Sequence, residues 1–181
     1  SLPATEEQVT KALAFIERQR GGGGTELLLA LKRALDIPKV PGFSRSIIIA
    51  TDGFVSVEEA AFDLIRNNLG EANLFPFGIG SSVNHHLIEG MARIGLGEPF
   101  VITKPSEAPD MAKKFRKLIQ FPVLTNIDLT FHKFQVYDVE PQTVPDVLAE
   151  RPVMVFGKWR GRPLGTIEIQ GENGEGTFRQ R

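Results

Sequence analysis

The chain has 181 residues, of which 41% are hydrophobic, so it is long enough for one large domain or for a domain with a small appendage. Its 21 Lys and Arg residues nearly balance its 22 Asp and Glu residues, and the net charge of -1 argues against a global attraction to nucleic acid or to an anionic bilayer. The lack of cysteine excludes disulfide scaffolds, thiolate zinc sites and cysteine nucleophiles. No apolar run approaches the roughly 20 residues of a membrane-spanning helix, so we expect no direct membrane insertion.

The first two thirds of the chain predict helices alternating with strands. Apolar residues at helical spacing predict five helices, over 6–19, 25–35 or 26–35, 56–69, 84–94 and 106–119; the second starts at Thr25 or Glu26. Thr5 and Gln8 form a capping box for the first helix, and Asn84 can cap the fourth. Short apolar runs predict strands over 46–51, 73–80 and 98–103. Strands that alternate with helices of this length are typical of an α/β fold with a parallel sheet.

Two of these strands carry specific expectations. The wholly apolar run Ile47–Ile49 predicts a strand that is buried on both faces of the sheet. Pro76 has no N–H to donate, which favours a bulge or a poorly paired position in the second strand.

The pattern changes after residues 121 and 122. Apolar and polar residues alternate over 127–132 and 167–170, which indicates antiparallel strands with one polar face. We therefore expect an α/β domain over 1–121, a small antiparallel β extension over 122–171, and a frayed tail over 172–181, which is polar and rich in glycine.

Two residues are candidates for a binding site. Asp52 directly follows the first strand, at the carboxyl end where open α/β sheets place their ligands, although an ordinary strand-to-loop turn explains the same residues. Thr25 follows four glycines, which allow close approach of a ligand to the backbone and can direct a hydroxyl toward a cation or phosphate, although a helix cap after a flexible linker is the simpler alternative.

Other patterns are weaker candidates for chemistry. The glycines at 78–80 lack the third glycine of a dinucleotide fingerprint, and no lysine follows 21–24 as in a phosphate loop. His85 and Glu89 lie one helical turn apart beside His86, but no third ligand has a suitable spacing, so we do not expect a metal there. No catalytic residue can be named.

Three stretches together resemble the von Willebrand factor type A (VWA) domain. They are GGGGTELLLAL, IIIATDGFVSVEEA and FPFGIGSSVNHHLIEGMARIGLGEPFVI, and the later VPDVLAERPVMVFGKW is similar to the inter-alpha-trypsin inhibitor heavy-chain type and its bacterial relatives. The resemblance implies a doubly wound, Rossmann-like parallel sheet with flanking helices and a non-enzymatic role in adhesion. It also implies a location that is extracellular, periplasmic or at the cell surface.

The resemblance further implies a metal-ion-dependent adhesion site. In that family a DxSxS loop, a threonine and an aspartate hold Mg²⁺ or a similar ion such as Mn²⁺ or Ca²⁺, and the ion binds an acidic side chain of a partner protein. Thr25 and Asp52 match the last two positions, so they are the expected metal ligands in this chain.

The chain departs from the family because DxSxS occurs nowhere in it. We therefore expect the carboxyl-terminal part of a VWA domain without its first strands, little or no Mg²⁺ binding by this chain alone, and possible self-association through the exposed strand 47–51. Two alternatives stay open: a structural interaction domain with a degenerate metal site, and an α/β enzyme half-domain that binds a nucleotide near Gly78–Ser82.

Overall fold

The structure is a computed structural model. It describes residues 2–20, 26–38, 40, 43–52, 54–70, 72–120, 123–133, 135–149, 151–162 and 164–181. Thr25 and the boundary expected at 121 and 122 lie outside these ranges.

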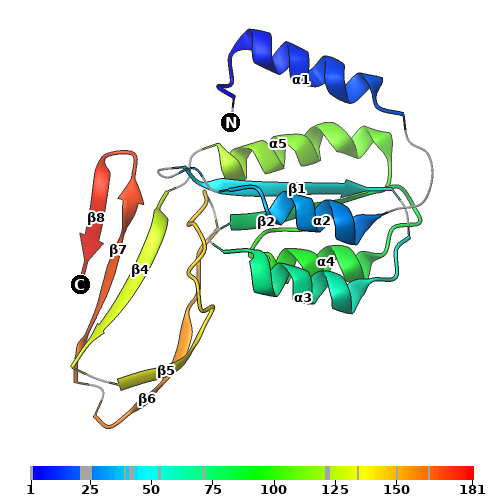
Figure 1. The fold of residues 1–181 in the computed structure, drawn as a ribbon. Helices are drawn as coiled ribbons and strands as arrows, with labels where there is room; N and C mark the ends of the chain where they lie inside the picture. The colour runs from blue at the N-terminus through cyan, green and yellow to red at the C-terminus, as the bar shows by residue number, and fades with distance from the viewer. Residues whose placement is uncertain are drawn as a thin grey trace.

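Helices and strands alternate through the first part of the chain as predicted (Figure 1). In chain order they are α1 (Glu6–Arg18), α2 (Leu27–Leu35), β1 (Arg45–Thr51), α3 (Glu58–Asn68), β2 (Ala72–Ile79), α4 (His85–Ile94), β3 (Phe100–Ile102), the 3₁₀ turn η1 (Pro105–Glu107) and α5 (Ala108–Ile119). The predicted cap of α4 is confirmed, because the Asn84 side chain accepts from the Leu87 N–H at 3.1 Å. Of the capping box predicted for α1, one half forms: the Thr5 hydroxyl accepts from the Gln8 N–H at 3.4 Å, but the Thr5 N–H donates to the Pro3 carbonyl.

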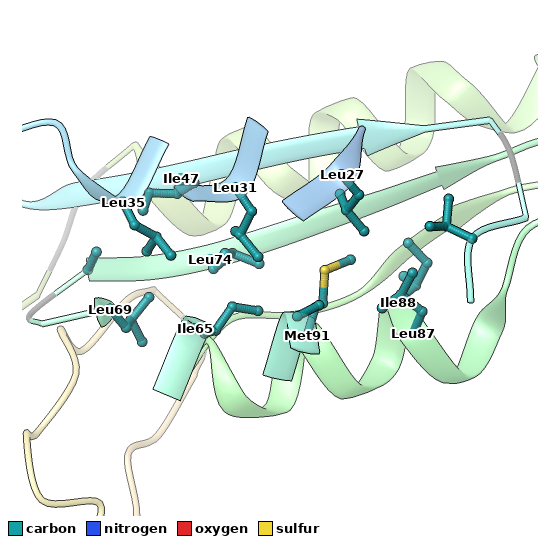
Figure 2. Packing of buried hydrophobic residues seen from close by; sticks show 13 residues of the cluster. Leu27, Leu31, Leu35, Ile47, Ile65, Leu69, Leu74, Leu87, Ile88 and Met91 are labelled. Atoms are coloured by element: carbon teal, nitrogen blue, oxygen red, sulfur yellow. The ribbon is translucent and has the colours of Figure 1, made fainter. Parts of the chain in front are cut away.

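The three strands form one parallel sheet in the order β1-β2-β3. Helices α2, α3 and α4 cover one face of this sheet, where their leucine, isoleucine and methionine side chains meet β1 and β2 (Figure 2). Leu31, Ile65, Leu74 and Met91 are fully buried at the centre of this layer. This cluster is the main hydrophobic core of the described residues.

The opposite face of the sheet carries an aromatic cluster under α5. Phe77 stacks on Phe100 with the ring centroids 4.5 Å apart, and Phe115 of α5 meets both rings and Phe75 edge-on at 5.2 to 5.6 Å. Offset stacked and edge-to-face pairs are the favourable arrangements of aromatic rings. Leu148, from the later part of the chain, is buried in the same cluster and so joins that part to the sheet.

The expectation that the first strand is buried on both faces is wrong. Ile47 and Thr51 are buried, but Ile48 on the other face is 53% exposed and Ala50 is also exposed. The reason is the position of β1, which lies at the edge of the described sheet and outside the cluster under α5. One face is therefore covered by helices and the other is open.

Pro76 does not interrupt the pairing of β2 with β1, where it stands opposite Ile49 without a bulge. Along a strand, successive backbone N–H groups point to opposite neighbouring strands. The N–H groups of Leu74 and Gly80 both point toward the β3 side, where they donate to the carbonyls of Gly95 and Ile102. Pro76 faces the same side, but β3 pairs with β2 only from Phe77 onward. The missing N–H therefore falls where the ladder does not need it.

The remaining chain forms two small antiparallel sheets, as predicted. One has the order β4-β7-β8 and contains β4 (Thr125–His132), β7 (Thr166–Asn173) and β8 (Gly176–Gln180), and the other pairs β5 (Gln135–Glu140) with β6 (Phe156–Arg160). We call residues 123–181 the β extension. Apolar side chains of the two sheets, including Phe131, Trp159 and Ile169, line an open groove of about 410 Å³ between them.

The expected frayed tail over 172–181 is wrong. β7 continues to Asn173, and β8 pairs with it from Gly176 opposite Asn173 to Gln180 opposite Ile169. Gly176 has a φ of +119°, a conformation that glycine adopts at little cost, so the polar stretch that suggested disorder makes a tight hairpin turn.

Candidate functional site

The candidate site lies at the carboxyl edge of the parallel sheet. All three strands end there, and they are followed by Asp52, by the loop 80–84 and by Thr103. Asp52 is exposed directly after β1, so its carboxylate is accessible to a cation or a partner. This placement agrees with the rule that ligands bind outside the carboxyl ends of parallel strands.

The first turn of α2 lies at the same edge. Figure 2 shows Leu27 near the arrowhead end of β1 and Leu35 near its start, so α2 begins where β1 ends. Thr25 precedes this turn but lies outside the described residues. The structure therefore brings the start of α2 and Asp52 to one edge, while the meeting of the Thr25 and Asp52 side chains stays a prediction.

Asn84 ties the loop after β2 to the loop after β1. Its Oδ1 caps α4, while its Nδ2 donates to the Val55 carbonyl at 2.9 Å and to Oε1 of Glu58 at 2.6 Å. Hydrogen bonds from the Glu58 backbone N–H and from Asn84 hold the pKa of the Glu58 carboxyl below its usual range. Asn84 is buried, so these bonds fix the two loops beside Asp52.

A second carboxylate, that of Glu107, binds the residues that directly follow β3. Glu107 accepts from the Thr103 N–H at 3.0 Å, from the Thr103 hydroxyl at 3.1 Å and from the Lys104 N–H at 3.2 Å. These backbone and hydroxyl donors lower the pKa of Glu107. Its carboxylate is therefore engaged in capping η1, which is a structural role.

The described residues at this edge do not make a complete metal site. Among them there is no group of three or more His, Asp or Glu side chains placed to hold an ion. A hard cation such as Mg²⁺ needs several oxygen ligands in near-octahedral geometry, and Asp52 offers one carboxylate. The described side chains alone therefore do not fit a tightly bound divalent cation. His86 of α4 is one of the two histidines that the sequence offered as weak metal-ligand candidates. Its ring packs edge-on against Phe62, with the ring centroids 5.9 Å apart.

Comparison with known families decides the relationship. Residues 1–98 match the sequence profile of the von Willebrand factor type A domain. This chain belongs to the VWA family. VWA domains generally serve as protein-interaction modules and commonly bind a divalent metal, and the resemblance noted in the sequence is thereby confirmed.

Curated VWA relatives resemble the chain at modest identity. A VWA domain-containing protein of Dictyostelium discoideum is 28% identical over 83% of the chain, the mouse VWA domain-containing protein 5B1 is 32% identical over 67%, and the pig inter-alpha-trypsin inhibitor heavy chain H2 is 26% identical over 91%. The matches cover only 17%, 10% and 19% of those proteins. The chain thus spans a small part of each relative.

Solved VWA structures share the fold. A von Willebrand factor type A protein from Catenulispora acidiphila superposes on 98% of the chain with a TM-score of 0.63 at 18% identity, and the VWA2 paralog of ArnB from Sulfolobus acidocaldarius on 90% with a TM-score of 0.57 at 19% identity. The chain covers 50% and 46% of those two proteins. In the part of this VWA chain that the structure describes, no helix is long and apolar enough to cross a bilayer.

Some features of this VWA edge escaped the sequence analysis. Asn84 was recognisable as a helix cap, but its bonds to Val55 and Glu58 join residues 29 and 26 positions away. A local pattern carries no signal for such pairs. The capping role of Glu107 was readable in principle, since it lies three residues after Lys104, the residue that precedes the turn.

Proposed function

We propose that this chain is part of a VWA adhesion module that binds an acidic side chain of a protein partner at the carboxyl edge of its sheet, without catalysis. The observation that carries the proposal is the exposed residue Asp52 directly after β1, at the sheet edge where α2 also begins. In a VWA domain this is the edge where a metal-ion-dependent adhesion site would stand. A location that is extracellular, periplasmic or at the cell surface belongs to the same proposal.

We further propose that a preceding segment of polypeptide supplies the rest of the sheet and of the metal ligands. Two features of the described residues support this. β1 has no partner on its outer side within the described sheet, and an open groove of about 810 Å³, lined by apolar residues such as Ile37, Phe43 and Ile48, lies beside the first half of the strand. An additional strand with a DxSxS loop at its end would cover this edge and bring further oxygen ligands toward Asp52 and Thr25.

Calorimetric titration with Mg²⁺ and Mn²⁺ tests the metal part of the proposal. We expect little or no heat of binding for this chain, and saturable binding for a chain extended at its amino end by about a hundred residues, a typical domain length. In the extended chain, Asp52→Asn is expected to weaken binding at least about tenfold, because even outer ligands of a metal site contribute that much.

The control for this experiment is Asp63→Asn, which removes an exposed carboxylate that pairs with Arg66 on α3. This variant should bind the ions as the unmodified extended chain does. Tight binding by the short chain would contradict the proposed division of ligands. If the extended chain bound neither ion, the adhesion site would be degenerate. The domain would then be a structural interaction module.

A free strand edge with exposed apolar residues also predicts self-association of this chain. β1 is the edge strand of the described sheet, and charged residues on such edges prevent pairing between copies. Analytical ultracentrifugation should therefore show an average mass that rises with concentration, and Ile48→Lys should reduce this rise. Met154→Lys, at an apolar site in the β extension that is 70% exposed, serves as the control. A mass that does not change with concentration would exclude pairing through β1.

A further inference from the structure

One end of the β extension gathers most of its positive charge. β4 ends there, β5 starts three residues later, β6 ends opposite the start of β5, and β7 begins after a short connection, so four strand ends meet (Figure 1). The cationic residues on or next to these ends and on the neighbouring β8 are Lys133, Lys158, Arg160, Arg162, Arg179 and Arg181. The chain as a whole has a net charge of -1, so this concentration of positive charge is local.

A buried carboxylate organises two of these cations. Glu168 of β7 is 1% exposed, and its two oxygens bind Arg179 at 2.6 Å and Nε of Arg181. Hydrogen bonds from Gln170, Arg181 and Arg179 lower the pKa of Glu168 to about 2. One carboxylate thus holds two guanidinium groups in place, and the group of three keeps a net positive charge.

A cavity of about 290 Å³ lies beside this group. It is lined by His132, Lys133, Thr166 and Arg181, which come from the end of β4, the start of β7 and the residue after β8. Among the described residues, its lining includes an ammonium, a hydroxyl and a guanidinium, and no side-chain carboxylate. Arg181 uses its Nε–H for Glu168, and an arginine has four further N–H groups with which to bind another acceptor.

His132 lines the cavity, and its imidazole approaches the buried carboxylate of Glu168. Its Nε2 is buried and makes no hydrogen bond with the described residues, and it lies 3.5 Å from Oε2 of Glu168. Because this nitrogen is shielded from solvent and faces Glu168, it is not itself open to a ligand in the cavity. The donors that a ligand in this cavity can reach are those of Lys133, Thr166 and Arg181.

We propose that this cavity is a binding site for a tetrahedral oxyanion, either phosphate or sulfate. The lining repels cations because it is positively charged, and an uncharged apolar ligand would leave its donors without acceptors. Donors on three different elements surround the cavity, which suits an anion with oxygens in several directions better than a planar carboxylate. The site lies in the β extension, away from the carboxyl edge of the parallel sheet, and does not depend on the proposed metal site.

Calorimetric titration of the full chain with sodium sulfate and sodium phosphate, in chloride buffer of fixed ionic strength, tests this site. We expect saturable binding of one anion per chain, and at least a tenfold loss of affinity in Arg181→Gln, because a charge-assisted bond is removed. Lys133→Asn should weaken binding severalfold, and it suits the backbone, since Lys133 has a φ of +64° and asparagine accepts this conformation well. Sodium acetate should bind more weakly than sulfate.

Lys113→Gln is the matched control. Lys113 is exposed on α5, and it does not belong to the β extension that holds the cavity. It should bind sulfate as the unmodified chain does. Thermal unfolding of each variant, followed by circular dichroism, shows whether a loss of binding reflects a loss of structure. Absence of saturable binding, equal binding by Arg181→Gln, or acetate binding as tight as sulfate binding would each overturn the proposal.

Discussion

Replacing Gly97 with alanine is expected to destabilise the fold by about 3 kcal/mol or to prevent folding, because overpacking against a rigid backbone cannot be relieved locally. A Cβ at this position would lie 1.8 Å from the carbonyl oxygen of Leu74 and 2.6 Å from its carbonyl carbon. Leu74 is fully buried in β2, which pairs with β1 on one side and β3 on the other. Either the loop before β3 or the central strand would have to shift.

Urea unfolding followed by circular dichroism measures this effect, with Gly174→Ala as the matched control. Nothing lies within 4 Å of a Cβ at Gly174, which sits in the turn between β7 and β8. The control should change the free energy of unfolding by less than about 0.5 kcal/mol, as surface substitutions usually do. Equal stability of the two variants would mean that the close approach of Gly97 to β2 does not exist in solution.

Replacing Leu31 with alanine is expected to lower the free energy of unfolding by about 2 to 5 kcal/mol, the usual range for a buried leucine. Leu31 is 0% exposed and packs with Leu74, Ile65 and Met91 in the layer between the sheet and helices α3 and α4 (Figure 2). Truncation would remove its apolar contacts and leave a cavity where helices and sheet meet. The urea midpoint should fall while the slope of the transition stays the same.

The control for this prediction is the same substitution two residues earlier. Leu29 lies on α2 as well, but it is 49% exposed, so Leu29→Ala should cost less than about 1 kcal/mol while changing helix propensity in the same way. A comparable loss of stability in both variants would show that helix propensity, rather than burial, determines the effect. It would also contradict the assignment of Leu31 to the core.

Local patterns predicted those elements whose formation depends on neighbouring residues. Helix α4 is the clearest example, because the Asn84 cap and the apolar residues Leu87, Ile88 and Met91 lie within one stretch of ten residues. The parallel sheet followed from the alternation of such elements with short apolar runs. The position of Asp52 at its carboxyl edge needed only the order of strand and loop.

Features that depend on distant residues could not be predicted in this way. Burial of β1 on one face only reflects which helices lie beside it, and the isoleucine run carries no information about this. Likewise β8 is ordered by pairing with β7, although its own composition is polar. The cavity beside Glu168 combines residues from β4, β7 and the end of the chain, so no spacing in the sequence indicates it.

The segment from Asp146 to Arg151 has a mechanical consequence. Asp146 accepts from the Ser44 hydroxyl, Leu148 is buried beside Phe75 and Phe100, and the guanidinium of Arg151 donates to the Leu96 carbonyl. A tensile force on the extension would be shared between the covalent chain that follows α5 and these three attachments. Such an arrangement resists bending at the junction, so the parallel-sheet part and the β extension should tumble in solution as one rigid body.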